Sequence, residues 1–232
     1  MKLKKTLNVF AIIGVVVVLF MAIMTSMSVK PTNAEQVWDS EMTIGNMEAK
    51  NYFIIYSDLV CPYCVAFENA IIENEEEFQE YIEENDILVE IRLSDFLYEY
   101  GESQSKQSRY SAEAVYCAKN EGKFWDYYNL AITTVWDDYF KDSGKSAFSS
   151  MNSLTKDYWI EIGKEVGLGE DFESCVKNGD VDEELEKVAA KMAKASSGLP
   201  SFKFNSEIFS GFDMSWGWDY VLMYFEAGLK SK

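Results

Sequence analysis

Two cysteines separated by two residues, in the segment Cys61-Pro62-Tyr63-Cys64, are the side chains of this chain best placed to do chemistry. They follow the apolar run 51–56, which has the composition of a buried strand, and they open a stretch with helical spacing of apolar residues. Residues three apart at the start of a helix share a face, so the two sulfurs can reach one another. Pro62 suits the first helical position, where no N–H donor is needed. The helix terminus favours a thiolate at Cys61, the species that attacks disulfides, so the spacing indicates redox chemistry.

The same cysteine pair has two other interpretations. It could be a purely structural disulfide, or it could supply two of the ligands of a metal site. A zinc site made of four cysteines needs a second close pair. The remaining cysteines, Cys117 and Cys175, are far apart in the sequence, so we predict no metal. The chain contains no histidine, which excludes Ser-His-Asp and Cys-His hydrolases and histidine-ligated zinc or haem. We predict no cofactor.

The net charge of the 232-residue chain is −18, and it is unevenly distributed. The first 34 residues hold four lysines and no acidic residue, so the remainder is more negative still. Such a surface repels nucleic acid and anionic lipid headgroups. We therefore predict no nucleic-acid partner and expect the charge to keep an exported domain soluble.

The N-terminal segment 1–34 has the layout of a secretory signal or a membrane anchor. Lys2, Lys4 and Lys5 precede an apolar run from Leu7 to about Met24. This run is longer than a usual signal core of about 7–15 residues, and it approaches the roughly 20 residues needed to span a bilayer. We favour an uncleaved anchor, which places residues 35–232 on the extracytoplasmic face of the membrane. The alternatives are a cleaved signal ending at Thr32-Asn33-Ala34, which would release a secreted protein, and a buried core helix.

The rest of the chain has the pattern of one α/β domain, residues 35–232. Apolar periodicity and breaker residues predict a helical block, about 97–195, inserted into a strand–helix–strand frame that closes with two strands and a helix. The expected strands are 51–56, 87–93, 201–205 and 207–210. The expected helices outside the block are 61–73, a continuation within 74–86, and 216–229.

Two segments of this pattern resemble the DsbA-like thiol–disulfide oxidoreductases of the thioredoxin superfamily. They are Ser57-Asp58-Leu59-Val60-Cys61-Pro62-Tyr63-Cys64 after a strand and Gly198-Leu199-Pro200-Ser201-Phe202 before a late strand. The resemblance covers roughly residues 40–230 and implies a thioredoxin fold with an inserted helical subdomain.

The resemblance also assigns roles to site residues. It implies that Cys61 is the exposed nucleophile and Cys64 the buried resolving cysteine. It implies that Pro200 is cis, lies beside the cysteine pair and, with Leu199, holds the substrate backbone. Pro62 and Tyr63 complete the predicted substrate-binding residues.

The chain departs from the best-known members of this family at Tyr63, where those members carry histidine. Tyrosine cannot supply a positive charge at neutral pH. No lysine or arginine occurs between Lys50 and Arg92, while acidic residues are frequent there. The helix terminus is then the main source of thiolate stabilisation, and we predict a weaker oxidant than the strongest members of the family.

The two other cysteines lie inside the predicted helical block. If Cys61 pairs with Cys64, Cys117 and Cys175 remain, and some relatives carry a structural disulfide within the helical insertion. We favour such a bridge. Two free buried thiols and a second redox pair are the alternatives.

The predicted function is that of an exported, membrane-anchored dithiol oxidase acting on reduced secreted proteins. By analogy with the family, a quinone-linked membrane partner would reoxidise it. A disulfide reductase or isomerase on the same scaffold is the first alternative. A non-catalytic tethered binding module, with Cys61–Cys64 as a structural disulfide, is the second. The catalytic interpretations require that solvent can reach the sulfur of Cys61.

Overall fold

The computed structural model describes residues 38–99, 105–142, 151–195 and 198–230. The predicted signal-anchor segment, 1–34, lies outside the described residues. Within the described ranges, no helix is both long enough and apolar enough to cross a bilayer.

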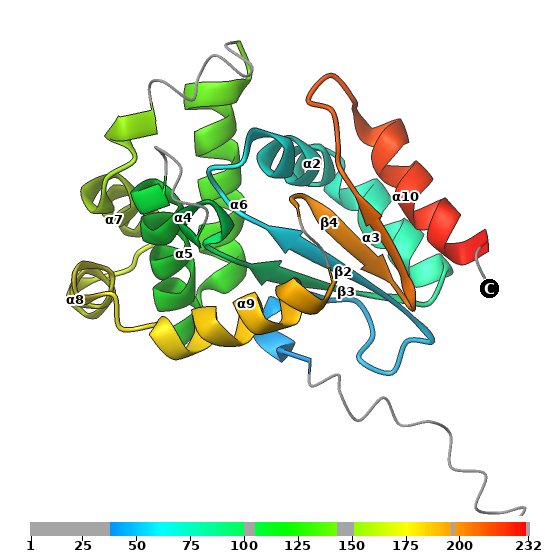
Figure 1. The fold of residues 1–232 in the computed structure, drawn as a ribbon, viewed down its shortest axis with the longest axis horizontal. Coiled ribbons are helices and arrows are strands. Elements are labelled where there is room, and N and C mark those ends of the chain that lie inside the picture. The colour runs from blue at the N-terminus through cyan, green and yellow to red at the C-terminus, as the bar shows by residue number, and fades with distance from the viewer. Residues whose placement is uncertain (1–37, 100–104, 143–150, 196–197, 231–232) are drawn as a thin grey trace, which may run out of the picture. The chain divides into compact units, whose positions relative to one another are not determined.

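The strands of the described region form one mixed sheet of five strands in the order β1-β3-β2-β4-β5 (Figure 1). The strands are β1 (Thr43–Ile44), β2 (Asn51–Ser57), β3 (Ile87–Leu93), β4 (Ser201–Phe204) and β5 (Glu207–Ser210). The central pair β2 and β3 is parallel, with Asn51 opposite Ile87 and Ser57 opposite Leu93. The pairs β1–β3, β2–β4 and β4–β5 are antiparallel.

Helices connect and cover these strands. Two helices, α2 (Pro62–Glu73) and α3 (Glu75–Glu84), link β2 to β3, and α10 (Trp218–Lys230) closes the chain. The block between β3 and β4 contains α4 (Phe96–Glu99), α5 (Ser105–Asn120), α6 (Phe124–Val135), a π-helix (Trp136–Phe140), α7 (Lys156–Glu165), α8 (Glu170–Asn178) and α9 (Asp182–Ala195). A short 3-10 helix, Ser40–Met42, precedes β1.

The alternation of side chains along β2 divides the core into two layers. Phe53 and Ile55 point to the face covered by α2 and α10, where Phe53 stacks on Phe225 with ring centroids 4.0 Å apart. Ile54 and Tyr56 point to the opposite face and pack with Met192 of α9. Because both faces are covered, β2 is apolar at successive positions rather than at alternate ones.

The predicted order of strands and helices is confirmed, and the predicted strand 87–93 matches β3 from end to end. The strand β1 was missing from the prediction, because its two residues are too few to give a periodic pattern. Within the predicted helical block, α8 begins directly after Gly169.

Candidate redox site

The cysteine pair lies at the N-terminus of α2, as predicted. Cys61 is the N-cap residue with extended backbone angles, Pro62 is the first helical residue, and Cys64 lies in the first turn. The carbonyl oxygen of Cys61 accepts the first helical hydrogen bond from the amide of Val65 at 3.0 Å. Both cysteines are free thiols in this structure.

The exposure of Cys61 differs from the expectation. We expected an exposed nucleophile, but Cys61 is buried, with 7% of its surface exposed, and Cys64 has 0% exposed. The reason is the path of the preceding loop: Leu59 and Val60 are fully buried and carry the chain inward before the helix begins. Cys61 is still the more accessible of the two cysteines, and Tyr63 is half-buried beside it.

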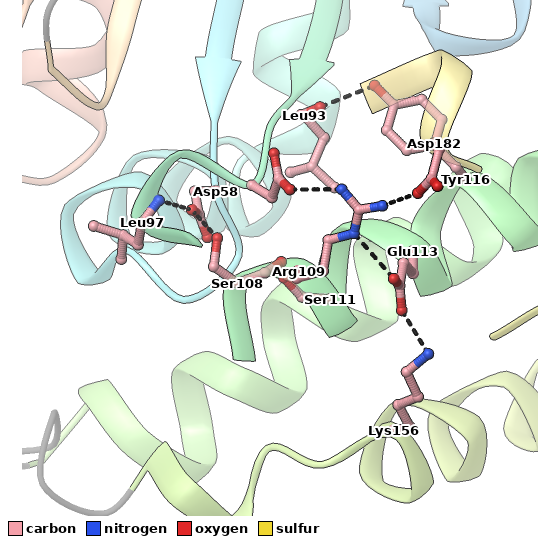
Figure 2. Close-up of polar contacts among 11 residues, drawn as sticks. Asp58, Leu93, Leu97, Ser108, Arg109, Ser111, Glu113, Tyr116, Lys156 and Asp182 are labelled. Atoms are coloured by element: carbon pink, nitrogen blue, oxygen red, sulfur yellow. Dashed lines mark hydrogen bonds and ion pairs between the residues drawn. The ribbon is translucent and has the colours of Figure 1, made fainter. Parts of the chain in front are cut away.

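Asp58 holds the loop that leads into the helix. Its carbonyl oxygen accepts a hydrogen bond from the amide of Cys61 at 3.0 Å, and its Oδ1 accepts one from the amide of Val60 at 3.0 Å. Its Oδ2 accepts hydrogen bonds from the Ser108 hydroxyl at 2.5 Å and the Leu97 amide at 3.2 Å, as Figure 2 shows. One buried carboxyl group therefore ties the cysteine loop to α4 and α5.

The helix α5 that carries Ser108 is itself held by a charged network (Figure 2). Arg109 pairs with Asp95 at 2.9 Å, with Glu113 at 3.0 Å and with Asp182. Glu113 also pairs with Lys156 of α7 at 2.8 Å. Because the side chains of Asp95 and Glu113 are almost fully buried, these pairs fix α5 against the loop after β3 and against α7.

Glu68 is a second buried carboxyl group next to the cysteines. It follows Cys64 by four positions on α2, so the two side chains share a face, and it is 2% exposed. Burial raises the pKa of Glu68 to about 7, while the nearby hydroxyls of Ser57 and Tyr128 oppose that rise. Among the described residues, neither carboxyl oxygen has a hydrogen bond of normal geometry. The carboxyl group lines an apolar cavity of about 50 Å³ beneath α2 and α6.

These two acids act on Cys64. Burial raises the pKa of the Cys64 thiol well above its ordinary value, and Cys61, then Glu68 and Asp58, raise it further. Burial likewise raises the pKa of Asp58 to about 6, against the hydrogen bonds from Ser108, Val60 and Leu97. Cys64 therefore holds its proton, and Glu68 is a group that exchanges a proton near neutral pH beside it.

The Leu199–Pro200 peptide bond is cis, as the resemblance implied. The β2–β4 register pairs Tyr56 with Ser201. Continuing this register brings Leu199 and Pro200 beside the loop that starts at Ser57 and ends at Cys61. The Pro200 carbonyl accepts a hydrogen bond from the Gly211 amide at 2.9 Å, whereas the backbone of Leu199 makes none with any described residue. The half-buried Leu199 is thus free to pair with an extended peptide.

The remaining cysteines lie in the helical block. Cys117 of α5 and Cys175 of α8 form a disulfide with an S–S distance of 2.02 Å. Cys117 is 1% exposed and Cys175 is half-buried.

Sequence reasoning did not single out Asp58, Ser108, Glu68 or Tyr128, which the structure places around the cysteine loop. The spacing from Cys64 to Glu68 was a usable signal, because residues four apart share a helix face. Nothing in the sequence indicated Ser108 or Tyr128, since both come from the helical block and reach the site only by tertiary packing.

Comparison with known proteins identifies the family to which this chain belongs. A family model described as Thioredoxin matches residues 38–216, so the chain belongs to the thioredoxin family. The predicted resemblance and the mixed α/β thioredoxin-like fold are confirmed. No curated protein matches the sequence.

Several solved structures share this fold. A thioredoxin-like oxidoreductase from Silicibacter pomeroyi has a TM-score of 0.57 and 19% identity, covering 84% of this chain and 95% of the other. BdbD from Bacillus subtilis has a TM-score of 0.59 and 16% identity, covering 82% and 93%. The disulfide bond oxidoreductase DsbG from Mycobacterium tuberculosis has a TM-score of 0.53 and 18% identity, covering 83% and 86%.

Proposed function

We propose that this chain is a thiol–disulfide oxidoreductase that uses Cys61 and Cys64, and that it oxidises cysteine pairs in reduced secreted proteins. The observation that carries the proposal is the placement of both cysteines at the N-terminus of α2, next to a Leu199 backbone with no partner in the described region. A dithiol at a helix terminus supplies the reactive sulfur, and the free backbone supplies a docking strand for an extended client.

The reaction starts from the Cys61–Cys64 disulfide. A client thiolate attacks the Cys61 sulfur, the bond to Cys64 breaks, and Cys64 leaves with the electron pair. Because burial opposes a thiolate at Cys64, this sulfur takes a proton, which Glu68 can donate near neutral pH.

A second client thiolate then attacks the client sulfur of the mixed disulfide. The client disulfide forms, and Cys61 leaves as a thiolate at the helix terminus. Two electrons have passed from the client to the enzyme. A membrane reoxidase, quinone-linked by analogy with the family, would remove them, and an extracytoplasmic location suits this cycle.

The small exposed surface of Cys61 is compatible with this step. Thiol–disulfide exchange requires only that a client thiolate can approach one sulfur of the disulfide. Because Cys61 is more exposed than Cys64, clients reach the sulfur of Cys61 first. Cys64 is protected until the mixed disulfide has formed.

Single substitutions in the full-length chain, incubated with a reduced and unfolded protein, test the proposal. We expect Cys61→Ser to abolish client oxidation while the circular dichroism spectrum stays unchanged. We expect Cys64→Ala, with oxidised glutathione added as the acceptor of the two electrons, to accumulate a mixed disulfide between Cys61 and the client. A Cys61→Ser variant that unfolds, from a parent with no oxidising activity, would instead support a structural disulfide in a binding module. A wild-type chain that only reduces or reshuffles client disulfides in glutathione buffer would support the reductase or isomerase alternative.

A further inference from the structure

A charged cavity of about 150 Å³ lies between β3, α5 and α9. Its lining includes Glu90 and Arg92 from β3, Lys119 from α5, and Lys187 and Lys191 from α9. It shares Ile91 with the apolar cavity beneath α2, but its lining includes neither cysteine of the redox site nor Asp58 or Glu68.

The charge of this cavity opposes that of the whole chain. Its lining holds four cationic side chains and three acidic ones, the acids being Asp39, Glu90 and Glu184. The cavity is therefore net positive within a chain of net charge −18. Such a local reversal of sign attracts anions from solution.

Internal ion pairs occupy two of the acids. Arg92 pairs with Glu90 at 2.6 Å, and Lys119 pairs with Asp39 at 2.5 Å. The other Glu90 oxygen accepts a hydrogen bond from the Asp39 amide at 3.1 Å. These pairs engage Asp39 and Glu90, whereas Glu184, the third acid of the lining, forms no ion pair with any described residue.

Several cationic donors remain without a matching acceptor. The Arg92 side chain is only 7% exposed, and its Nε has no hydrogen-bond acceptor among the described residues. Lys191 forms no ion pair with any residue that the structure describes. Burial, and then the Arg92 charge, lower the pKa of Lys191, while the charges of Glu90 and Asp39 oppose that fall. Lys187 pairs with the exposed Glu183 on its own helix, and the hydrogen bond to Glu183 and the charges of Glu183 and Glu184 raise its pKa.

We propose that this cavity binds a small oxyanion, of the phosphate, sulfate or carboxylate class, through the ammonium groups of Lys187 and Lys191, with the buried charge of Arg92 adding electrostatic attraction. A volume of about 150 Å³ equals roughly five water molecules, enough for such an ion. Oxyanions suit guanidinium and ammonium donors. A metal cation is disfavoured because no group of three metal-ligating side chains occurs among the described residues.

Binding would join α9 to the sheet. The two lysines lie on α9, and Arg92 lies on β3, where its Nη1 also donates to the Tyr56 hydroxyl at 3.0 Å. On the same face of the sheet, Met192 of α9 packs with Tyr56 and Leu199. An ion bound by the lysines of α9 and attracted by the Arg92 charge on β3 therefore stabilises the native state, by an amount that grows with the logarithm of its concentration above the Kd.

Titration of the full-length chain with sodium phosphate, sulfate or acetate at constant ionic strength tests the proposal. We expect saturable one-to-one binding by calorimetry and a rise in melting temperature for at least one of these ions. Amide chemical shifts should change at Tyr116 and Lys119 and stay constant at Tyr63. Lys191→Gln should weaken binding about tenfold. The matched control Lys141→Gln, an exposed lysine outside the cavity, should leave it unchanged.

Three results would overturn the proposal. The first is the absence of saturable binding for every ion up to about 10 mM, a concentration above the Kd of even weak specific sites. The second is equal affinity in the Lys191→Gln and Lys141→Gln variants, which would place the ion elsewhere. The third is saturable binding of a divalent cation that shifts the same amides.

Discussion

Replacing Glu68 with glutamine tests the electrostatics of the redox site most directly. Glutamine keeps the size and polarity of the side chain and removes its ionisation. In the native chain the carboxyl group is 2% exposed, and its pKa is raised by burial from 4.5 to about 7. A carboxyl group with a higher pKa in the folded state binds more protons when folded. It therefore stabilises the fold at low pH, and this contribution is lost as the pH rises through about 7.

The size of the effect follows from the pKa values. A rise from 4.5 to about 7 corresponds to roughly 3 kcal/mol of unfolding free energy lost between about pH 4 and pH 8. Burial also raises the pKa of Asp58 from 3.8 to about 6. Asp58 therefore adds a further loss of unfolding free energy with rising pH, and this loss is complete at a lower pH than that of Glu68. Near pH 7, the pH dependence of the unfolding free energy is therefore caused mainly by Glu68.

Urea unfolding of the reduced chain from pH 5 to pH 8.5 provides the measurement. We expect the wild-type stability to fall over this range and the Glu68→Gln stability to fall less, with the gap reaching about 2–3 kcal/mol at the alkaline end. At pH 5 the two proteins should differ by less than about 1 kcal/mol, because the native carboxyl group is then neutral. The rate of the step that protonates Cys64 should also lose its pH dependence near 7 in the variant.

Glu76→Gln, at an exposed position in the first turn of α3, is the matched control and should follow the wild-type curve. The reasoning is refuted if Glu68→Gln and wild type show parallel curves. It is also refuted if the variant is the less stable protein at pH 8.5, because that result would mean that the native carboxylate is stabilised by partners.

Three further variants test the hydrogen bonds, the disulfide and the packing that support the site and the core. Ser108→Ala removes the 2.5 Å hydrogen bond to Asp58 and should cost about 1–3 kcal/mol in urea unfolding at pH 7, with slower client oxidation. The double variant Cys117→Ala/Cys175→Ala opens a loop with a sequence separation of 58 and should lose about 4 kcal/mol of unfolding free energy while Cys61 stays reactive. Gly228→Ala places a Cβ 2.1 Å from the Phe204 ring and should lower calorimetric stability by about 1–3 kcal/mol.

Matched controls accompany the serine and glycine variants. Ser206→Ala, in an exposed turn, should leave both stability and oxidation rate unchanged. The Cβ added by Gly217→Ala meets no atom within 4 Å, so this variant should be tolerated. Equal losses of stability in Gly217→Ala and Gly228→Ala would contradict the packing argument. Loss of client oxidation in the double cysteine variant, with its fold intact, would show that the second disulfide takes part in the redox reaction.

The sequence determined those features that depend on neighbours along the chain. The run 51–56 had the apolar, β-branched and aromatic composition of a strand covered on both faces, and β2 has this environment. The helix after Pro62 followed from local signals alone, because Pro62 is compatible only with its first turn and apolar residues recur along α2. The cysteine spacing then placed both sulfurs at that terminus.

The tertiary structure decided the burial of Cys61 and the surroundings of Cys64. Ser108 and Tyr128 come from the helical block, and Glu68 became unusual only when the sheet, α2 and α6 closed around it. The charged cavity under α9 likewise joins residues of β3 and α9 that are almost a hundred positions apart. Burial and the pKa shifts that it causes depend on which elements pack together, and local periodicity carries no information about that packing.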